Sequence, residues 1–366
     1  MKAAVLHNFH EPLRVEAVDL MEPQAGEVRV KLAASGVCHS DLHVVKGDLP
    51  MPTPVILGHE GAGIVDAVGP GVTTVQKGDH VVLSWVPYCG KCFFCGRGDF
   101  HLCEVAAQGA FMGGMYDGST RFSLNGTAVH HFAGVSSFSE YTVVAEHGAI
   151  PIRKDAPLDA ACLVGCGVMT GVGAVINTAK VEAGASMVVF GAGGVGLNVI
   201  QGGALVGAEK IIAVDLVESK LKMAEEFGAT HTVNAAKGDA VDQVRALTGG
   251  RGVDYAFEVI GSPAVVLQAF MSLRRGGRVI VVGVPPLTAQ ISVPGFSLPL
   301  EEKGIIGSCY GSAKMRTDMP RLVDLFMAKK LKINELISKR IGLGDVNHAF
   351  EQMEKGEVAR SVVVFQ

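Results

Sequence analysis

The stretch SMVVFGAGGVG, residues 186–196, decides the fold of one half of the chain. Its apolar start predicts a short buried strand, and Gly191, Gly193 and Gly196 then follow in the spacing G-x-G-x-x-G before a helical pattern. The first glycine permits a tight turn, the second lets a pyrophosphate approach the backbone, and the third lets the helix pack closely on the strand. The free N–H groups at the start of that helix attract negative phosphates. These residues therefore predict a dinucleotide site.

The acidic residue that such a site needs follows at the expected distance. The next strand pattern, residues 211–214, ends at Asp215, about 20 residues after the glycines. A carboxylate at this place binds the ribose hydroxyls and repels a 2′-phosphate, so we expect NAD rather than NADP. The alternative is a glycine turn that binds no ligand, and the position of Asp215 counts against it.

Strand and helix patterns alternate around this stretch. Short apolar runs recur up to residue 306, and helical patterns at 219–227, 240–247 and 263–273 separate them. This alternation predicts an α/β domain with a doubly wound parallel sheet of the Rossmann type. Residues before about 159 hold short β-branched runs between glycines and prolines, which predict an all-β or α+β unit. The pattern alone does not place the tail, which contains an amphipathic segment at 319–329 and a terminal strand pattern.

The composition limits the class of protein. Of the 366 residues, 48% are hydrophobic and 19% are charged, which excludes global disorder. The mean hydropathy is +0.34, yet glycine and polar residues interrupt every apolar run, so we expect no membrane span. The net charge of −4, without a dense basic run, disfavours nucleic acid as a partner. The N-terminus lacks a secretory pattern, so we expect a cytoplasmic protein whose cysteines bind metal more readily than they form disulfides.

Four closely spaced cysteines predict a structural zinc site. Their spacing is C-x2-C-x2-C-x7-C, and they are Cys89, Cys92, Cys95 and Cys103. Four thiolates can close a tetrahedron around zinc and leave no open position for chemistry. Ligation of an iron–sulfur cluster is an alternative, although the C-x3-C-P ending of the bacterial pattern is absent. Disulfides are a second alternative, which the expected reducing compartment disfavours.

A second metal site is predicted from three separated residues, Cys38, His59 and Cys166. Two thiolates and one imidazole leave one zinc position open for water or substrate, as in catalytic zinc sites. Asp41 and Glu60 lie close in sequence to these ligands and can support them. Each residue alone is more commonly a buried thiol or a hydrogen-bonded core histidine, so the hypothesis rests on the set.

Taken together, these motifs resemble the zinc-dependent medium-chain alcohol dehydrogenases along the whole chain. The segments that carry the resemblance are GVCHSDLHVVKGDLP (36–50), GHEGAGIV (58–65), CGKCFFCGRGDFHLC (89–103), DGSTRF (117–122) with HHF (130–132), GCGVMTGVGAV (165–175), GAGGVGL (191–197) and VVGVPP (281–286). The resemblance implies a β-rich, GroES-like catalytic domain of residues 1–167 and 307–366, and an NAD-binding Rossmann domain of residues 168–306. It also implies two zinc ions per subunit, an active site in the cleft between the domains, and a homodimer or homotetramer.

The resemblance implies NAD-dependent interconversion of primary alcohols and aldehydes by hydride transfer. Zinc favours the alkoxide form of the alcohol, and Ser40 passes the proton through the cofactor ribose to His43. Asp41 orients His59, and Glu60 either approaches the zinc or pairs with an arginine. The alternatives for Ser40 and His43 are a helix N-cap and an ordinary surface histidine.

By the same resemblance, several residues contact the cofactor. His39 and Arg360 reach the pyrophosphate, and Lys220 reaches the adenosine ribose. The positions around the nicotinamide are Thr170, Val195, Val282 and Val284. Without the resemblance, the first three would be solvated side chains and the other four would be core or turn residues.

The substrate channel is expected to be mostly apolar. In addition to Ser40 and Val284, the resemblance lines it with Leu49, Trp85, Gln108, Phe132, Ala133 and Ile306. Trp85 narrows the inner pocket and favours primary alcohols, and Ala133 leaves room further out. Leu49 and Ala107 replace an acid and an arginine with which the glutathione-linked relatives hold their adduct, which argues against that substrate. A thiol-adduct-dependent formaldehyde dehydrogenase is the alternative, and a non-catalytic binding or structural protein is a second one.

Overall fold

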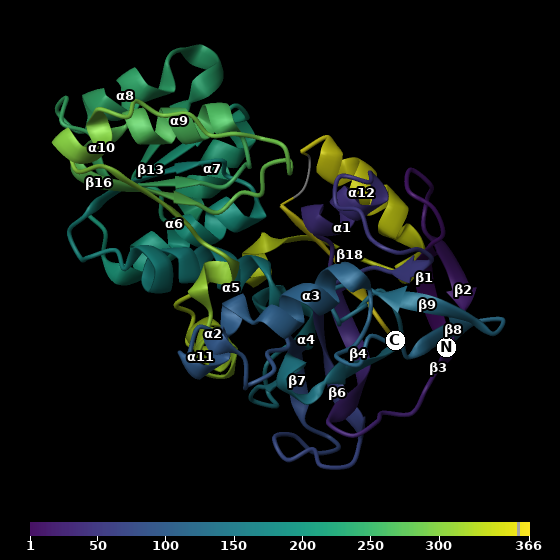
Figure 1. The fold of residues 1–366 in the computed structure, drawn as a ribbon. Coiled ribbons are helices and arrows are strands. Elements are labelled where there is room, and N and C mark those ends of the chain that lie inside the picture. Colours follow the sequence, from purple (N-terminus) through teal and green to yellow (C-terminus); the bar gives the residue numbers. More distant parts are fainter. Residues whose placement is uncertain (357–358) are drawn as a thin grey trace. The chain divides into compact units, whose positions relative to one another are not determined.

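The chain forms two compact units, which Figure 1 colours along the sequence. This computed structural model describes residues 1–356 and 359–366. The first unit comprises Met1–Gly167 together with Lys314–Gln366, and the second unit is Val168–Ala313. The second unit is therefore continuous in sequence, whereas the first unit is built from both ends of the chain.

The second unit contains a six-stranded parallel sheet. Its order is β14-β13-β12-β15-β16-β17, so the direction of winding reverses between β12 and β15. The strands are β12 (Ser186–Phe190), β13 (Lys210–Asp215), β14 (His231–Asn234), β15 (Val253–Glu258), β16 (Leu273–Val281) and β17 (Gly304–Gly307). The predicted doubly wound α/β fold is confirmed.

Helices follow the strands of this unit. They are α6 (Gly194–Val206), α7 (Glu218–Glu226), α8 (Ala240–Leu247), α9 (Pro263–Met271) and α10 (Ser297–Leu300), and a π-helical turn spans Ala174–Ala179. Local sequence signals set their ends. The Asp239 side chain accepts from Asp242 N and caps α8, and Gly207 ends α6 in the left-handed region. Phe190 of β12 packs in one buried cluster with Val244 of α8 and other helix residues. Helices therefore cover the central strands of the sheet.

The first unit is rich in β-structure, as predicted. One sheet has the order β2-β1-β5-β9-β8-β3 and the other β11-β7-β6-β4-β19-β18, with β10 also paired to β4. Their strands are β1 (Lys2–Leu6), β2 (Arg14–Ala17), β3 (Asp19–Leu20), β4 (Glu27–Gly36), β5 (Val55–Ile56), β6 (Glu60–Val68), β7 (His80–Leu83), β8 (Phe122–Leu124), β9 (Thr127–His131), β10 (Tyr141–Ala145), β11 (Ala149–Pro151), β18 (Ile337–Ile341) and β19 (Arg360–Val364).

Short helices complete this unit. They are α1 (His39–Val45), α2 (Phe93–Gly96), α3 (Glu104–Met112), α4 (Leu158–Ala161), α11 (Met315–Met327) and α12 (Val346–Glu354), and α5 (Gly167–Gly173) begins at its border. The yellow C-terminal strand β19 lies beside the purple strand β4 in Figure 1, and Val362 pairs with Gly36. The terminal strand, which the pattern alone did not place and the resemblance assigned to the catalytic domain, is therefore part of the sheet that carries β4.

The border after the second unit differs from the predicted one. The sequence assigns residues 307–366 to the catalytic domain, whereas the second unit continues to Ala313. Hydroxyl groups hold this connection: Thr178 is hydrogen-bonded to Ser308 at 2.8 Å and to Ser312 at 2.7 Å. The prediction missed these bonds because their partners lie about 130 residues apart in the sequence.

The length and hydropathy of the helices can be compared with what a membrane span requires. Within residues 1–356 and 359–366, no single helix is long and apolar enough to cross a bilayer, and one pair bent by 55°, Leu158–Gly165 with Gly167–Ala179, passes the same test of length and composition.

Candidate active site and metal centres

Helix α1 begins directly at the first predicted zinc ligand. Strand β4 ends at Gly36, and Cys38 is the N-cap of α1 with an extended backbone. The Cys38 N–H donates to Asp41 Oδ2 at 3.1 Å, which satisfies one free donor of the first turn. Ser40 is therefore inside the helix, and the alternative interpretation of Ser40 as its N-cap is wrong.

The buried Asp41 carboxylate ties three parts of the site together. Besides Cys38, its Oδ1 accepts from Gly58 N at 2.9 Å and from His59 Nδ1 at 3.1 Å. An ionised carboxylate only accepts, so the proton of the imidazole lies on Nδ1. The second nitrogen, Nε2, is buried and has no hydrogen-bond partner. A lone pair left in this way suits a metal ligand.

Four buried side chains offer ligand atoms at one point. One atom each from Cys38, His59, Glu60 and Cys166 lies within 4.8 Å of all the others. A hydrogen bond from Cys166 lowers the pKa of the Cys38 thiol well below its ordinary value, helped by the charges of Arg360 and His59. Two sulfurs and one imidazole nitrogen are the donors that zinc prefers, so this set fits a zinc ion.

Glu60 has one oxygen paired and the other free. Its Oε1 accepts from Arg360 Nη2 at 3.2 Å and from Gly167 N at 3.2 Å, whereas the buried Oε2 has no partner. Burial raises the pKa of Glu60 to about 7, although the charge of Arg360 opposes the rise. A Cβ at position 36 would lie 2.1 Å from Oε2, so glycine is required there. The structure thus shows the pairing with an arginine, and approach of Glu60 to the zinc stays a prediction.

Arg360 faces inward in this structure. It is 5% exposed, and besides Glu60 its Nη1 donates to Val37 O at 3.2 Å. Its guanidinium therefore holds the last strand to the metal site. Contact with a pyrophosphate, which the sequence predicts for Arg360 and for the exposed His39, stays a prediction.

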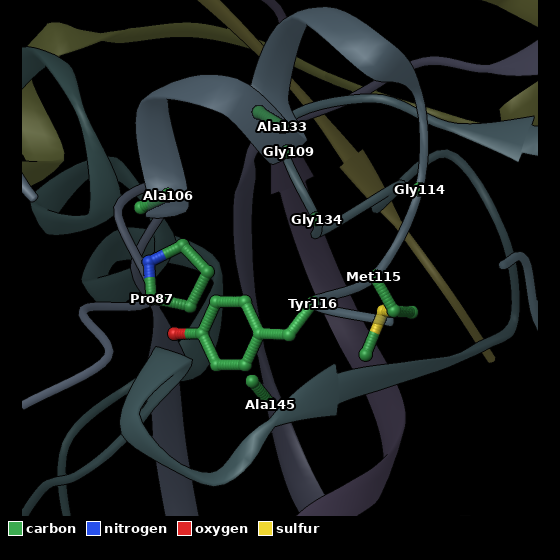
Figure 2. A pocket seen from close by; sticks show the side chains of 9 residues that line it. All are labelled: Pro87, Ala106, Gly109, Gly114, Met115, Tyr116, Ala133, Gly134 and Ala145. Carbon is green, nitrogen blue, oxygen red and sulfur yellow. The ribbon is translucent and has the colours of Figure 1, made fainter. Parts of the chain in front are cut away.

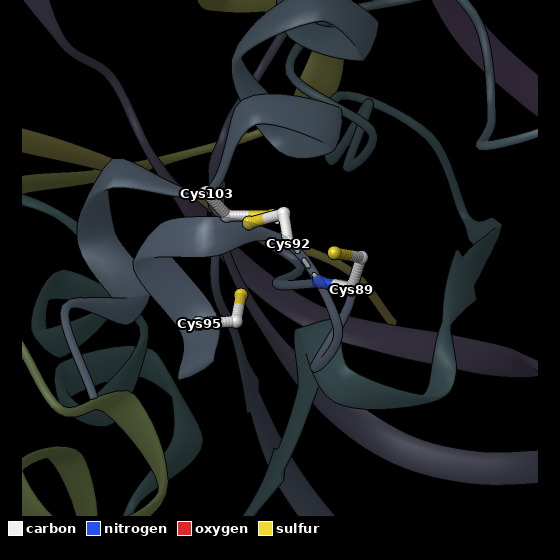
Figure 3. A group of neighbouring side chains, drawn as sticks. All are labelled: Cys89, Cys92, Cys95 and Cys103. Atoms are coloured by element: carbon white, nitrogen blue, oxygen red, sulfur yellow. Dashed lines mark hydrogen bonds between the residues drawn. The ribbon is translucent and has the colours of Figure 1, made fainter. Parts of the chain in front are cut away.

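Figure 3 shows the second metal centre, where the side chains of four cysteines face one another. Their sulfurs lie within 4.8 Å of one another, and the residues are Cys89, Cys92, Cys95 and Cys103. Cys89 N donates to Cys103 Sγ at 3.2 Å, which is how backbone amides stabilise thiolates. All eight cysteines, which lie within the described residues, are free thiols. Disulfides are thus excluded in this structure, and four convergent sulfurs fit a structural zinc.

The predicted relay residues lie on one face of α1. Ser40 is half-buried with its Oγ 3.8 Å from Cys38 Sγ, and His43 is exposed one turn later. His43 Nδ1 is hydrogen-bonded to Asp48 Oδ2 at 3.1 Å. Sequence reasoning missed Asp48, because an acid five residues after a histidine is no signal of a pair outside a regular helix.

The three glycines of the dinucleotide motif have the backbone conformation, close packing and open space that the motif requires. Gly191 has a φ of +100°, and a Cβ at Gly196 would lie 1.8 Å from the Gly191 carbonyl oxygen. A Cβ at Gly193 would meet nothing within 4 Å, so the space beside this amide is open. Asp215 ends β13, and its Oδ2 accepts from Ala192 N at 2.8 Å. The carboxylate is therefore fixed at the end of β13 beside the glycine loop that follows β12, where NAD would bind.

The remaining predicted cofactor residues lie in the second unit, and no contact in the structure assigns them. Thr170 lies in α5, Val195 in the first turn of α6 and Lys220 in α7. Val282 and Val284 follow β16, and Val284 is 79% exposed. Their roles stay predictions.

Most of the predicted channel residues of the first unit gather beside the metal site. Phe132 packs edge-on against His59, with ring centroids 5.3 Å apart and an interplanar angle of 89°. Leu49 and Trp85 pack against the buried cluster that contains Phe132 and Ala133. Gln108 is exposed on α3, and Ile306 lies in β17 of the second unit.

A shallow recess lies beside α3, and Figure 2 shows the residues that line it. The lining is almost wholly apolar and consists of Pro87, Ala106, Gly109, Gly114, Met115, Tyr116, Ala133, Gly134 and Ala145. Ala133 is the only predicted channel residue among them. The recess is therefore a neighbour of the metal site and not the predicted channel itself.

Comparisons with known proteins identify the family. A family model of the alcohol dehydrogenase GroES-like domain matches residues 24–154, and a zinc-binding dehydrogenase model matches residues 194–328. This chain belongs to the zinc-dependent medium-chain alcohol dehydrogenases. The resemblance found in the sequence is thus confirmed, as are the fold class and the assignment to an oxidoreductase family that uses zinc and NAD.

Individual relatives match over the full length. An S-(hydroxymethyl)glutathione dehydrogenase of Paracoccus denitrificans is 44% identical over 100% of this chain and 99% of its own. A class-3 alcohol dehydrogenase of Dictyostelium discoideum is 42% identical over 99% and 97%. The crystal structure of benzyl alcohol dehydrogenase from Acinetobacter calcoaceticus has a TM-score of 0.95 at 36% identity and covers 100% and 99%.

Proposed function

We propose that this chain is a zinc- and NAD-dependent dehydrogenase that oxidises the hydroxymethyl group of a thiol–formaldehyde adduct to the corresponding S-formyl thiol. The observation that supports the chemistry is the buried cluster of Cys38, His59 and Cys166, in which His59 Nε2 has no partner other than the metal it would bind. The names of relatives at 42–45% identity support the adduct as substrate.

Zinc would act at Cys38, His59 and Cys166 as a Lewis acid that favours the deprotonated hydroxyl, and NAD would accept the hydride. Asp41 fixes the neutral tautomer of His59 that leaves the lone pair on Nε2, because its carboxylate accepts the Nδ1 proton. The Phe132 ring packs perpendicular to the imidazole and places apolar surface beside it. Ser40 lies beside Cys38 Sγ, where it would accept the substrate proton and pass it outward along α1 to His43.

A free primary alcohol is the second candidate substrate. Leu49 and Trp85 place apolar surface against the cluster that holds Phe132 and Ala133, and such surface suits an alkyl or aryl chain. Leu49 and Ala107 also offer no charge to the carboxylates of glutathione. We therefore expect the thiol of the adduct to be one that does not depend on paired charges at these two positions.

The deciding experiment is an NAD reduction assay on zinc-replete protein. Formaldehyde is supplied with each member of a panel of thiols, glutathione included, and free primary alcohols from ethanol to benzyl alcohol are assayed alone. Turnover that requires both formaldehyde and a thiol supports the proposal. Turnover of free alcohols without any thiol assigns the second candidate, and no turnover with any compound contradicts both.

A further inference from the structure

At the outer end of α1, the relay residue His43 contacts Asp48, a residue that the proposed mechanism does not use. Ser40 and His43 are three residues apart and therefore lie on one face of the helix. Exposure increases along this face, from the half-buried Ser40 to His43, whose side chain is 46% exposed. Asp48 Oδ2 lies 3.1 Å from His43 Nδ1, so the carboxylate continues the line of polar groups toward solvent.

The backbone after α1 places Asp48 at this point. The helix ends at Val45 with Lys46 as its C-cap, and Gly47 has a φ of +75°, which reverses the chain. Leu49 N then donates to His43 O at 3.1 Å. The residue between Gly47 and Leu49 is thereby brought back against the last turn of the helix.

We propose that Asp48 is a positioning residue for the proton relay, because it holds the His43 imidazole in the one orientation and tautomer that can accept the proton. A carboxylate only accepts hydrogen bonds, so His43 Nδ1 carries the hydrogen in this pair. Its Nε2 therefore keeps a lone pair for the incoming proton. This inference rests on the proposed function, in which His43 receives the proton from the side of Ser40.

The proton balance of the step is simple. Neutral His43 accepts one proton at Nε2 and becomes an imidazolium, whose positive charge lies beside the Asp48 carboxylate. The imidazolium then releases one proton to bulk water and returns to its neutral form. Asp48 undergoes no net change, and no further reactant is needed.

Other charged groups near this end of α1 do not take the place of Asp48. Lys46 is paired with Glu354 of α12 at 2.5 Å, so its charge is compensated. His39 lies one turn earlier on the same helix and is exposed. Among the hydrogen bonds and ion pairs of the described residues, the contact with Asp48 is the one that fixes the His43 ring.

The kinetic test compares Asp48→Ala and Asp48→Asn in the holoenzyme. Loss of the hydrogen bond in Asp48→Ala should lower kcat/KM for oxidation of the substrate by about 2- to 10-fold. Asp48→Asn keeps an accepting oxygen and should recover most of this loss. In the His43→Gln background, Asp48→Ala should have no further effect. Glu16→Ala is the matched control, because it removes another histidine–carboxylate pair, with His7 at 2.7 Å, far along the sequence from α1.

A second readout does not depend on turnover. Nitrogen-15 NMR of labelled histidine distinguishes the two neutral tautomers, and the His43 signal is assigned by its loss in His43→Gln. We expect the Nδ1–H tautomer in the unmodified protein and in Asp48→Asn, and a mixture in Asp48→Ala. An unchanged tautomer and rate in Asp48→Ala would overturn the inference alone. An unchanged rate in His43→Gln would overturn both the inference and the relay of the proposed function.

Discussion

At the scale of single residues, the side chain of Asp41 accepts three hydrogen bonds within the candidate site. Its two oxygens accept from Cys38 N, Gly58 N and His59 Nδ1, so one carboxylate sets the position of two metal ligands. Asp41→Ala should lower zinc affinity at this site by about 10- to 100-fold, because groups that orient ligands contribute this much. Zinc release into a chromogenic chelator measures the effect.

The control for this prediction is Asp41→Asn. Its remaining oxygen can still accept from His59, so its zinc affinity should lie between those of Asp41→Ala and the unmodified protein. Equal zinc retention in all three proteins would contradict the role of Asp41.

Asp215 is the residue on which the preference for NAD depends. Its Oδ2 accepts from Ala192 N at 2.8 Å and its Oδ1 from Val217 N at 3.0 Å. Asp215→Ala should weaken NADH binding by about 10-fold, because the partner of the ribose hydroxyls is lost. It should also reduce the difference in affinity between NADH and NADPH, because the charge that repels a 2′-phosphate is lost. Fluorescence titration with each cofactor checks this.

An acidic residue elsewhere in the second unit serves as the control. Asp239 caps α8, and Asp239→Ala should leave both dissociation constants unchanged. The prediction is wrong if Asp215→Ala weakens the binding of NADH and the binding of NADPH by the same factor.

At the scale of elements, the hairpin of β8 and β9 carries a pH-dependent contribution to stability. Burial, with the charges of Arg121 and His130, lowers the pKa of His131 to about 3. In the unfolded chain the same group titrates near 6.5, so only the unfolded state takes up a proton below that pH. The free energy of unfolding should therefore fall by about 2 kcal/mol between pH 7 and pH 5 on account of this residue.

His131→Asn tests this sign. The variant should lose the part of the pH dependence that lies between pH 7 and pH 5, as measured by urea unfolding at both values. His348→Gln, at an exposed histidine of α12, should keep the full dependence. A His131→Asn protein with the same pH dependence as the unmodified chain would disprove the assignment.

The elements also show what local sequence can and cannot predict. Residues 240–247 were predicted as a helix and form α8, because Asp239 gives a clear start signal. The amphipathic segment at 319–329 lies largely in α11, which begins earlier, at Met315, since Lys314 N donates to Asp318 Oδ2 and closes the first turn. Pro320 lies inside that helix, where a breaker pattern would place an end.

At the scale of the whole molecule, the sequence predicted the parts of the candidate site but not how the last strand joins it. Spacing was enough to find the four cysteines and the glycines, because their partners lie close in sequence. The pairing of β19 with β4, and of Arg360 with Glu60, joins residues about 300 positions apart. No local pattern encodes such contacts, since only the assembled sheet brings them together.

The ion pair of Arg360 and Glu60 should therefore contribute to the stability of the first unit. Arg360→Met leaves a buried carboxylate without its partner, which should cost about 3 kcal/mol or more. The double variant Arg360→Met with Glu60→Gln should recover much of this loss, because the uncompensated charge is removed. Urea unfolding followed by Trp85 fluorescence gives both values, and a double variant no more stable than Arg360→Met would contradict this account.

Because the first unit is built from both ends of the chain, synthesis on the ribosome completes the second unit before the first. The sheet of the second unit is complete once residue 313 has been made, so this unit can fold while the chain is still growing. The sheet that holds Gly36 and Glu60 lacks β18 and β19 until the final residues emerge. Arg360, which pairs with Glu60 beside the catalytic metal site, is thus synthesised after the whole second unit, so a nascent chain that stops at residue 313 has the dinucleotide fold but not this ion pair.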